Sequence, residues 1–70
     1  MKLLDRTFAI LRELGREPAG LGVTELAGRL GLAKSTTSRL LAALEAQSAV
    51  ARDGRNQFTI GPAISQLAAA

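Results

Sequence analysis

The chain has 70 residues, the size of one small domain, and it contains no cysteine and no histidine. These totals exclude a disulfide framework, a thiolate nucleophile and imidazole chemistry, and the scattered acids offer a serine no base, so we expect no enzyme, no cofactor and no metal site. The net charge of +3 lies entirely in residues 27–70, which hold five cations and two acids against four of each in residues 1–26, and this asymmetry indicates a polyanionic partner.

The stretch KLLDRTFAILREL, residues 2–14, predicts an amphipathic helix of about three turns whose outer face carries Arg6, Arg12 and Glu13. A loop over residues 15–22, rich in glycine, ends this helix. The opening residues do not resemble a signal peptide, and no apolar run reaches the ~18 residues of a membrane span. We therefore expect a cytoplasmic protein that contacts no membrane.

A short helix and a longer helix come next. Thr24 is expected to cap the short helix and Gly31 to end it in the left-handed conformation. The residues around Val23 also suit a short edge strand before that cap. The longer helix is predicted over residues 34–47, with its leucines and Thr37 on the inner side. The Thr37 hydroxyl is expected to bond to the carbonyl one turn earlier.

The remaining residues predict a hairpin and the beginning of another helix. Strands are expected over residues 50–52 and 57–60, around a tight tip from Asp53 to Asn56. Gly61 and Pro62 interrupt the pattern, and residues 63–70 then begin a helix that has no stop signal. We interpret this last helix as the start of a linker in a truncated chain.

Two helices joined by a glycine turn and followed by a hairpin predict a mainly α fold with a small β hairpin, the winged helix-turn-helix. In this arrangement the second helix, residues 34–47, enters the major groove of DNA with its N-terminal residues, and a wing over residues 50–60 rests on the backbone or in the minor groove. Small hydroxyls permit close approach, and an arginine one turn further, Arg39, can bond a guanine bidentately. The predicted DNA contacts are Lys34, Ser35, Thr36, Ser38, Arg39, Arg52, Arg55 and Asn56.

Each of these residues also has a simpler interpretation. The hydroxyls of residues 35–38 suit a helix N-cap, and the arginines of the helix and hairpin suit a solvated surface. Arg29 fits a phosphate contact and an exposed helix position equally well. The arginines of the first helix are favoured as solvated residues or dimer contacts over DNA contacts. As a whole, the alternative function is a winged-helix protein–protein interaction module without DNA binding, although residues 34–44 lack the acids that such a surface would favour.

The segments RTFAILREL, TELAGRLGLAKST, SRLLAALE and FTIGP occur in the order found in one known family. With them, the chain resembles the N-terminal DNA-binding domain of the IclR-type bacterial transcription regulators. The resemblance implies a homodimeric repressor or activator on a palindromic operator in double-stranded DNA, paired through the first and last helices. It also implies a small-molecule effector bound by a C-terminal domain absent from this chain, so that residues 1–62 form the DNA-binding domain and residues 63–70 begin the linker helix.

The chain departs from the family pattern at several positions. Thr37 stands where valine is usual, and Ser38 stands where histidine or another large residue is frequent. Ser48 occupies a usual glycine position at the end of the helix. If the left-handed conformation is kept there, serine costs roughly 1 kcal/mol.

Overall fold

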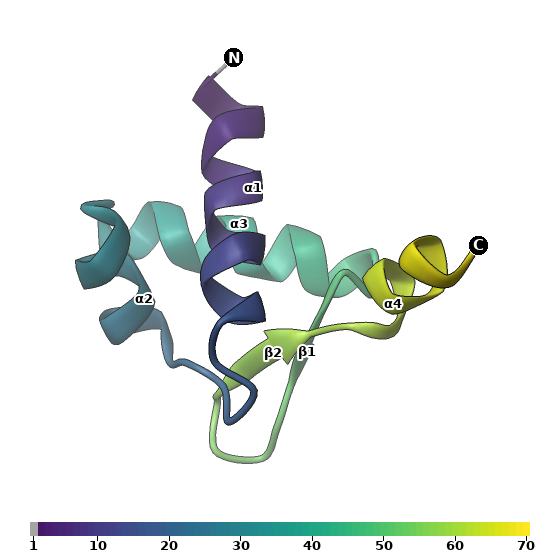
Figure 1. The fold of residues 1–70 in the computed structure, drawn as a ribbon. Helices are drawn as coiled ribbons and strands as arrows, with labels where there is room; N and C mark the ends of the chain where they lie inside the picture. Colours follow the sequence, from purple (N-terminus) through teal and green to yellow (C-terminus); the bar gives the residue numbers. More distant parts are fainter. Residues whose placement is uncertain (1) are drawn as a thin grey trace.

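The computed structural model describes residues 2–70 (Figure 1). The elements in chain order are α1 (Lys2–Gly15), α2 (Val23–Leu30), α3 (Lys34–Ala46), β1 (Val50–Arg52), β2 (Phe58–Ile60) and α4 (Pro62–Ala69). The first three helices surround one core, the two strands form an antiparallel hairpin below α3 in the view of Figure 1, and α4 follows beside the C-terminal end of α3. This architecture confirms the predicted winged helix-turn-helix.

The core lies where α1, α2, α3 and the hairpin meet. Its largest fully buried side chains are Phe58, Ile10, Leu14, Leu26, Leu41 and Val50. Each contributes about 1.5–3 kcal/mol by leaving water. Phe58 also joins two backbone segments, because it faces Arg52 across the hairpin and exchanges hydrogen bonds of 2.8 and 3.0 Å with Leu21 on its other side.

This contact between Leu21 and Phe58 bears on two predictions for the start of α2. A strand-like pairing does precede the cap, as expected, but Leu21 makes it and Val23 is already helical. The predicted N-cap at Thr24 is wrong. Gly22 is therefore the N-cap, it makes no side-chain cap bond, and Thr24 falls inside the first turn. At the other end the prediction is confirmed: Gly31 has φ +65° and closes α2 in the left-handed conformation.

Helix α3 follows the prediction closely, ending at Ala46 with Gln47 as its C-cap. Thr37 is fully buried, and its hydroxyl donates a hydrogen bond of 3.0 Å to the carbonyl of Ala33, as expected. Just beyond the helix, Ser48 has φ +58°. The strained left-handed position predicted at Ser48 is therefore kept.

The tip of the hairpin is held by one carboxylate. Asp53 accepts hydrogen bonds from the backbone N–H groups of Gln57 (3.0 Å) and Arg55 (2.7 Å), and Asn56 has φ +59°. The bonds from Gln57 and then Arg55 stabilise the carboxylate and lower the pKa of Asp53. Because Gln57 completes this turn, β2 begins at Phe58, one residue later than predicted.

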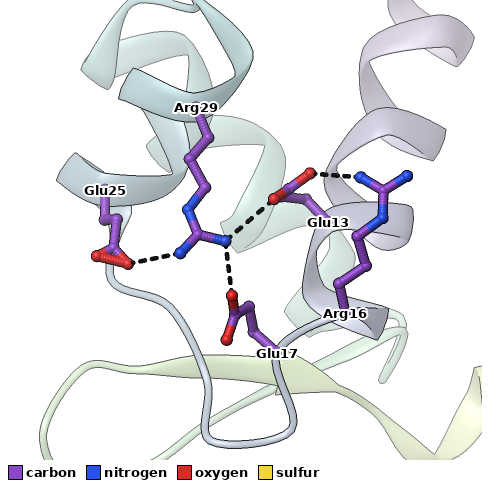
Figure 2. Close-up of polar contacts among 5 residues, drawn as sticks. All are labelled: Glu13, Arg16, Glu17, Glu25 and Arg29. Atoms are coloured by element: carbon purple, nitrogen blue, oxygen red, sulfur yellow. Dashed lines mark hydrogen bonds and ion pairs between the residues drawn. The ribbon is translucent and has the colours of Figure 1, made fainter.

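An ion-pair network joins α1, the following loop and α2 (Figure 2). The Arg29 guanidinium lies 2.9 Å from a Glu17 carboxylate oxygen, 3.1 Å from one of Glu13 and 3.2 Å from one of Glu25, and Arg16 binds Glu13 at 2.9 Å. The hydrogen bond from Arg29 is the main cause that lowers the pKa of Glu13. One sequence prediction is corrected here, because the Glu13 side chain is 15% exposed and does not lie on the outer face of α1. Arg29 is an exposed helix residue, which is one of the two interpretations left open for it, and it is paired with glutamates.

Helices α1 and α4 each extend beyond the core. Leu3, Leu4 and Phe8 are 62%, 50% and 48% exposed, and Leu67 is 74% exposed. By contrast, α4 begins in a tight joint at Gly61, and Pro62 occupies the first turn, where a missing N–H is tolerated. Within residues 2–70 no helix is long and apolar enough to cross a membrane.

Candidate nucleic-acid interface

The first two turns of α3 present a polar face to solvent. Lys34, Ser35, Ser38 and Arg39 are exposed and Thr36 is half-buried. The N-cap of α3 is Ala33, which makes no side-chain cap bond, and none of the three outward hydroxyls bonds to another group in the described residues. The interpretation of these hydroxyls as a capping cluster is therefore wrong, and their bonding capacity is available to a ligand.

The wing tip and the start of α3 meet at a groove of about 450 Å³. Its lining includes Lys34, Arg55 and Asn56, three of the predicted contacts, together with Gln57 and the first residues of α2. Among the described residues the carboxylate in that lining is Glu25, which shares the Arg29 guanidinium with Glu13 and Glu17. The structure thus brings one predicted contact of the helix, Lys34, together with two predicted contacts of the wing, Arg55 and Asn56.

Arg52 is placed differently from the other predicted contacts. It lies at the base of the wing, where its guanidinium binds Glu45 at 3.0 Å and stacks 4.8 Å from the centroid of the Phe58 ring. It does not line the groove at the wing tip. The ion pair joins the hairpin to α3, and the stacking contact joins β1 to β2, so the position of Arg52 is explained without a ligand.

A second groove, of about 400 Å³, lies between α1 and α3. It is lined by Lys2, Leu3, Arg6, Thr36, Arg39 and Leu40. Sequence reasoning gave Lys2 no role and favoured a solvated or dimer-forming face for Arg6, so it did not place either residue beside α3. Their spacing of four residues does place them on one flank of α1, but the neighbour that this flank faces depends on packing between distant segments.

The cations that line the two grooves differ in their pairing from most of the others. Outside the grooves, Arg16, Arg29 and Arg52 are paired with glutamates, and Arg12 lies over the Phe8 ring. In the part of the chain that the structure describes, no carboxylate pairs with the cations that line the two grooves, which are Lys2, Arg6, Lys34, Arg39 and Arg55. Within residues 2–70, five cations without a carboxylate partner thus line the grooves on the two sides of α3, and such a cluster favours a polyanion.

Comparison with known proteins assigns the chain to a family. The family model of the IclR helix-turn-helix domain matches residues 3–54, which include α1, α2, α3 and β1. The chain belongs to the IclR helix-turn-helix family. Its resemblance to IclR-type regulators, inferred above from short segments, is thereby confirmed.

Two relatives with this domain match nearly the whole chain. The HTH-type transcriptional regulator Rv1719 of Mycobacterium tuberculosis is 39% identical over 69 residues, which are 97% of this chain and 27% of that protein. The HTH-type transcriptional regulator TtgV of Pseudomonas putida is 37% identical over 68 residues, 96% of this chain and 26% of that protein. The chain therefore spans about a quarter of the length of these relatives.

Two solved structures share the fold of this IclR domain. An IclR transcriptional regulator from Alicyclobacillus acidocaldarius superposes with a TM-score of 0.92 at 30% identity, over 99% of this chain and 28% of that one. The repressor BlcR of Agobacterium tumefaciens superposes with a TM-score of 0.87, also at 30% identity, over 99% and 28% of the two chains. The family is one of DNA-binding transcription regulators and not of enzymes, and it gives no support to the protein–protein interaction alternative.

Proposed function

We propose that this IclR domain reads DNA with the first two turns of α3 in the major groove and with the wing, residues 50–60, on the backbone or in the minor groove. The observation that carries the proposal is the face of α3, where exposed hydroxyls without internal partners stand beside unpaired cations. A helix that enters a groove end-on needs small side chains that donate to phosphates and a longer one that reaches base edges.

The residues then divide into three roles. Lys34, at the N-terminal end of α3, binds phosphate, and Arg39 bonds bidentately to a guanine. Ser35, Thr36 and Ser38 allow close approach and donate to phosphates or base edges. At the wing, Arg55 and Asn56 contact the backbone or the minor groove, and Arg52 reaches a phosphate only by sharing its guanidinium with Glu45.

We extend the proposal to the assembly. The protein pairs as a homodimer through the exposed apolar parts of α1 and α4, and its two α3 helices read a palindromic operator whose half-sites lie about one helical turn, or a multiple of it, apart. Residues 1–62 form the DNA-binding domain and residues 63–70 begin a linker to an effector-binding domain outside this chain. The protein then acts in the cytoplasm, at the nucleoid.

The test begins with selection of bound duplexes from a random-sequence pool, followed by anisotropy titrations on the selected site. We expect Arg39→Ala to weaken binding to that site by about 1–3 kcal/mol and to relax specificity at one base pair. Lys34→Ala should weaken binding to all sequences alike and reduce the salt slope by about 1, because one phosphate contact is lost.

The matched control is Arg12→Ala, which removes an arginine whose guanidinium lies over the Phe8 ring on α1, away from both grooves. It should leave the preferred sequence unchanged. Wild-type titration curves for both Arg39→Ala and Lys34→Ala would refute the assignment of α3 to the groove.

A further inference from the structure

Building on the proposed function, we infer that the start of α1 is a second contact with the DNA backbone, in which Lys2 and Arg6 bind phosphates on the side of α3 away from the wing. Figure 1 shows the arrangement: α1 starts above α3, and the tip of the hairpin lies below it. The two grooves described above follow this division, one lined by α1 and α3 and the other by the wing tip and the start of α3.

The first argument is the direction of the side chains on α1. At about 100° per residue, Lys2 and Arg6 lie roughly 40° apart on one flank, whereas Leu4 and Phe8 lie on the opposite flank. The basic flank lines the groove that also holds Thr36 and Arg39 of α3. The two cations are therefore directed toward Thr36 and Arg39 and away from Leu4 and Phe8, while Leu3 lines the groove beside them.

The second argument is charge. Lys2, Arg6 and Arg39 line the groove, and within residues 2–70 no carboxylate does. Glu13 shares the same flank of α1 further along the helix, but it is bound by Arg29 and Arg16. Three cations gathered without a counter-ion repel one another, so the groove is stabilised by an anion placed within it.

The third argument selects DNA as that anion and not a second copy of the chain. A two-fold dimer contact brings the same patch of both subunits together, so pairing through this groove would oppose like charges. A helix lying in the major groove, by contrast, has a phosphate backbone along both of its sides. The wing supplies contacts on one side, and Lys2 and Arg6 supply them on the other.

The experiment measures the salt dependence of binding to a mixed-sequence duplex, which reports phosphate contacts whatever the operator is. Each lost phosphate contact reduces the slope of log K against log salt by about 0.9. We expect Lys2→Ala and Arg6→Ala each to reduce the slope by about that amount, and the double variant by about 1.8. Arg6→Lys should retain the wild-type slope, because it keeps the charge.

The control is again Arg12→Ala, which removes one positive charge from the same helix outside the groove. A wild-type slope in the double variant, or an equal reduction of the slope in Arg12→Ala, would overturn the inference. The proposed function would still stand in that case if Arg39→Ala and Lys34→Ala weaken binding. A double variant that changes the sedimentation coefficient of the free protein, with no change of slope, would assign the groove to a second copy instead. A wild-type protein that binds no duplex at any salt concentration would overturn both proposals.

Discussion

Among the residues that the structure describes, Thr37 is the one polar side chain that is buried, and it is fully enclosed in the core. Its hydroxyl donates to the carbonyl of Ala33, but that carbonyl already accepts the Thr37 backbone N–H at 3.0 Å. The hydroxyl bond thus satisfies the side chain and adds little to the helix. Burial of a hydroxyl costs free energy that such a bond only offsets.

We predict that Thr37→Val raises the free energy of unfolding by about 1 kcal/mol, because it keeps the shape of the side chain and removes the buried hydroxyl. Thr37→Ala should lower it by about 1 kcal/mol, because a methyl-sized void remains. Urea denaturation followed by circular dichroism measures both changes. If the valine variant were less stable than the wild type, the hydroxyl bond would have to outweigh the cost of its burial.

At the scale of elements, the Arg29 network is a polar contact that holds α1 and α2 together. It connects α1, the loop after it and α2 through carboxylates on three sides of one guanidinium (Figure 2). The neighbouring glutamates, Glu17 first, raise the pKa of Arg29, while the arginines lower that of Glu13. The groups are open to solvent, so salt screens this attraction.

We predict that Arg29→Gln lowers the melting temperature at neutral pH, and by more in low salt than in high salt. The pKa of Glu13 is lowered in the folded state. The ionised Glu13 therefore adds to the free energy of unfolding above its unfolded pKa of about 4.3, and this addition is lost as the pH falls through its folded-state pKa. The variant lacks that contribution at every pH, so its stability should fall less steeply below about pH 4.3 than that of the wild type.

Thermal melts between neutral and acid pH, at two salt concentrations, measure this difference. Glu25→Gln is the control, because the Glu25 side chain is 57% exposed and is the most exposed partner of Arg29. It should shift the melting temperature less than Arg29→Gln does. Parallel pH profiles for Arg29→Gln and the wild type would show that the network contributes nothing.

The elements also show how far sequence reasoning extends. The face of α3, the turn at Gly31 and the hairpin tip depend on periodicity and turn chemistry within a few residues, and all three were predicted correctly. The predicted start of α2 was wrong because Leu21 pairs with Phe58, which lies 37 positions further along the chain. No local pattern contains such a pairing.

The same limit applies to the candidate site. The predicted contacts on α3 follow from its helical period, so their exposure could be inferred. The neighbourhood of Arg6 could not, because it depends on which flank of α1 faces α3. Arg52 illustrates the converse: its residue type suggested a ligand contact, and packing gave it Glu45 and Phe58.

At the scale of the whole molecule, the apolar side chains left outside the core lie on α1 and α4. Leu3, Leu4 and Phe8 are each about half exposed or more, and Leu67 is 74% exposed. In a domain of 70 residues with a small core, such exposure is costly unless a second surface covers it. Leu4 and Phe8 lie on the flank of α1 opposite Lys2 and Arg6, so the surface proposed for pairing is centred on these two residues, and Leu3 lies beside the proposed backbone contact.

We predict that Phe8→Glu converts the proposed homodimer to a monomer without unfolding it, because Phe8 is 48% exposed and contributes little to the core. Sedimentation velocity over a range of concentrations measures the change. The control is Gln47→Glu, which adds the same charge at an exposed position beyond α3 and should leave sedimentation unchanged. A wild-type chain that is monomeric at all concentrations, or a Phe8→Glu protein that still pairs, would exclude α1 from the interface.

Gly61 gives the molecule a mechanical property. A methyl group at this position would collide with the Ser48 carbonyl and stand 2.9 Å from the backbone carbons of Ala49 and Val50. The Gly61 N–H donates to the Ala49 carbonyl at 2.8 Å, and the Ala63 N–H donates to the Ser48 carbonyl at 3.0 Å. The backbone around Gly61 is packed too closely to bend on its own. We therefore expect a rotation of α4 to move the C-terminal end of α3 and the start of β1 with it.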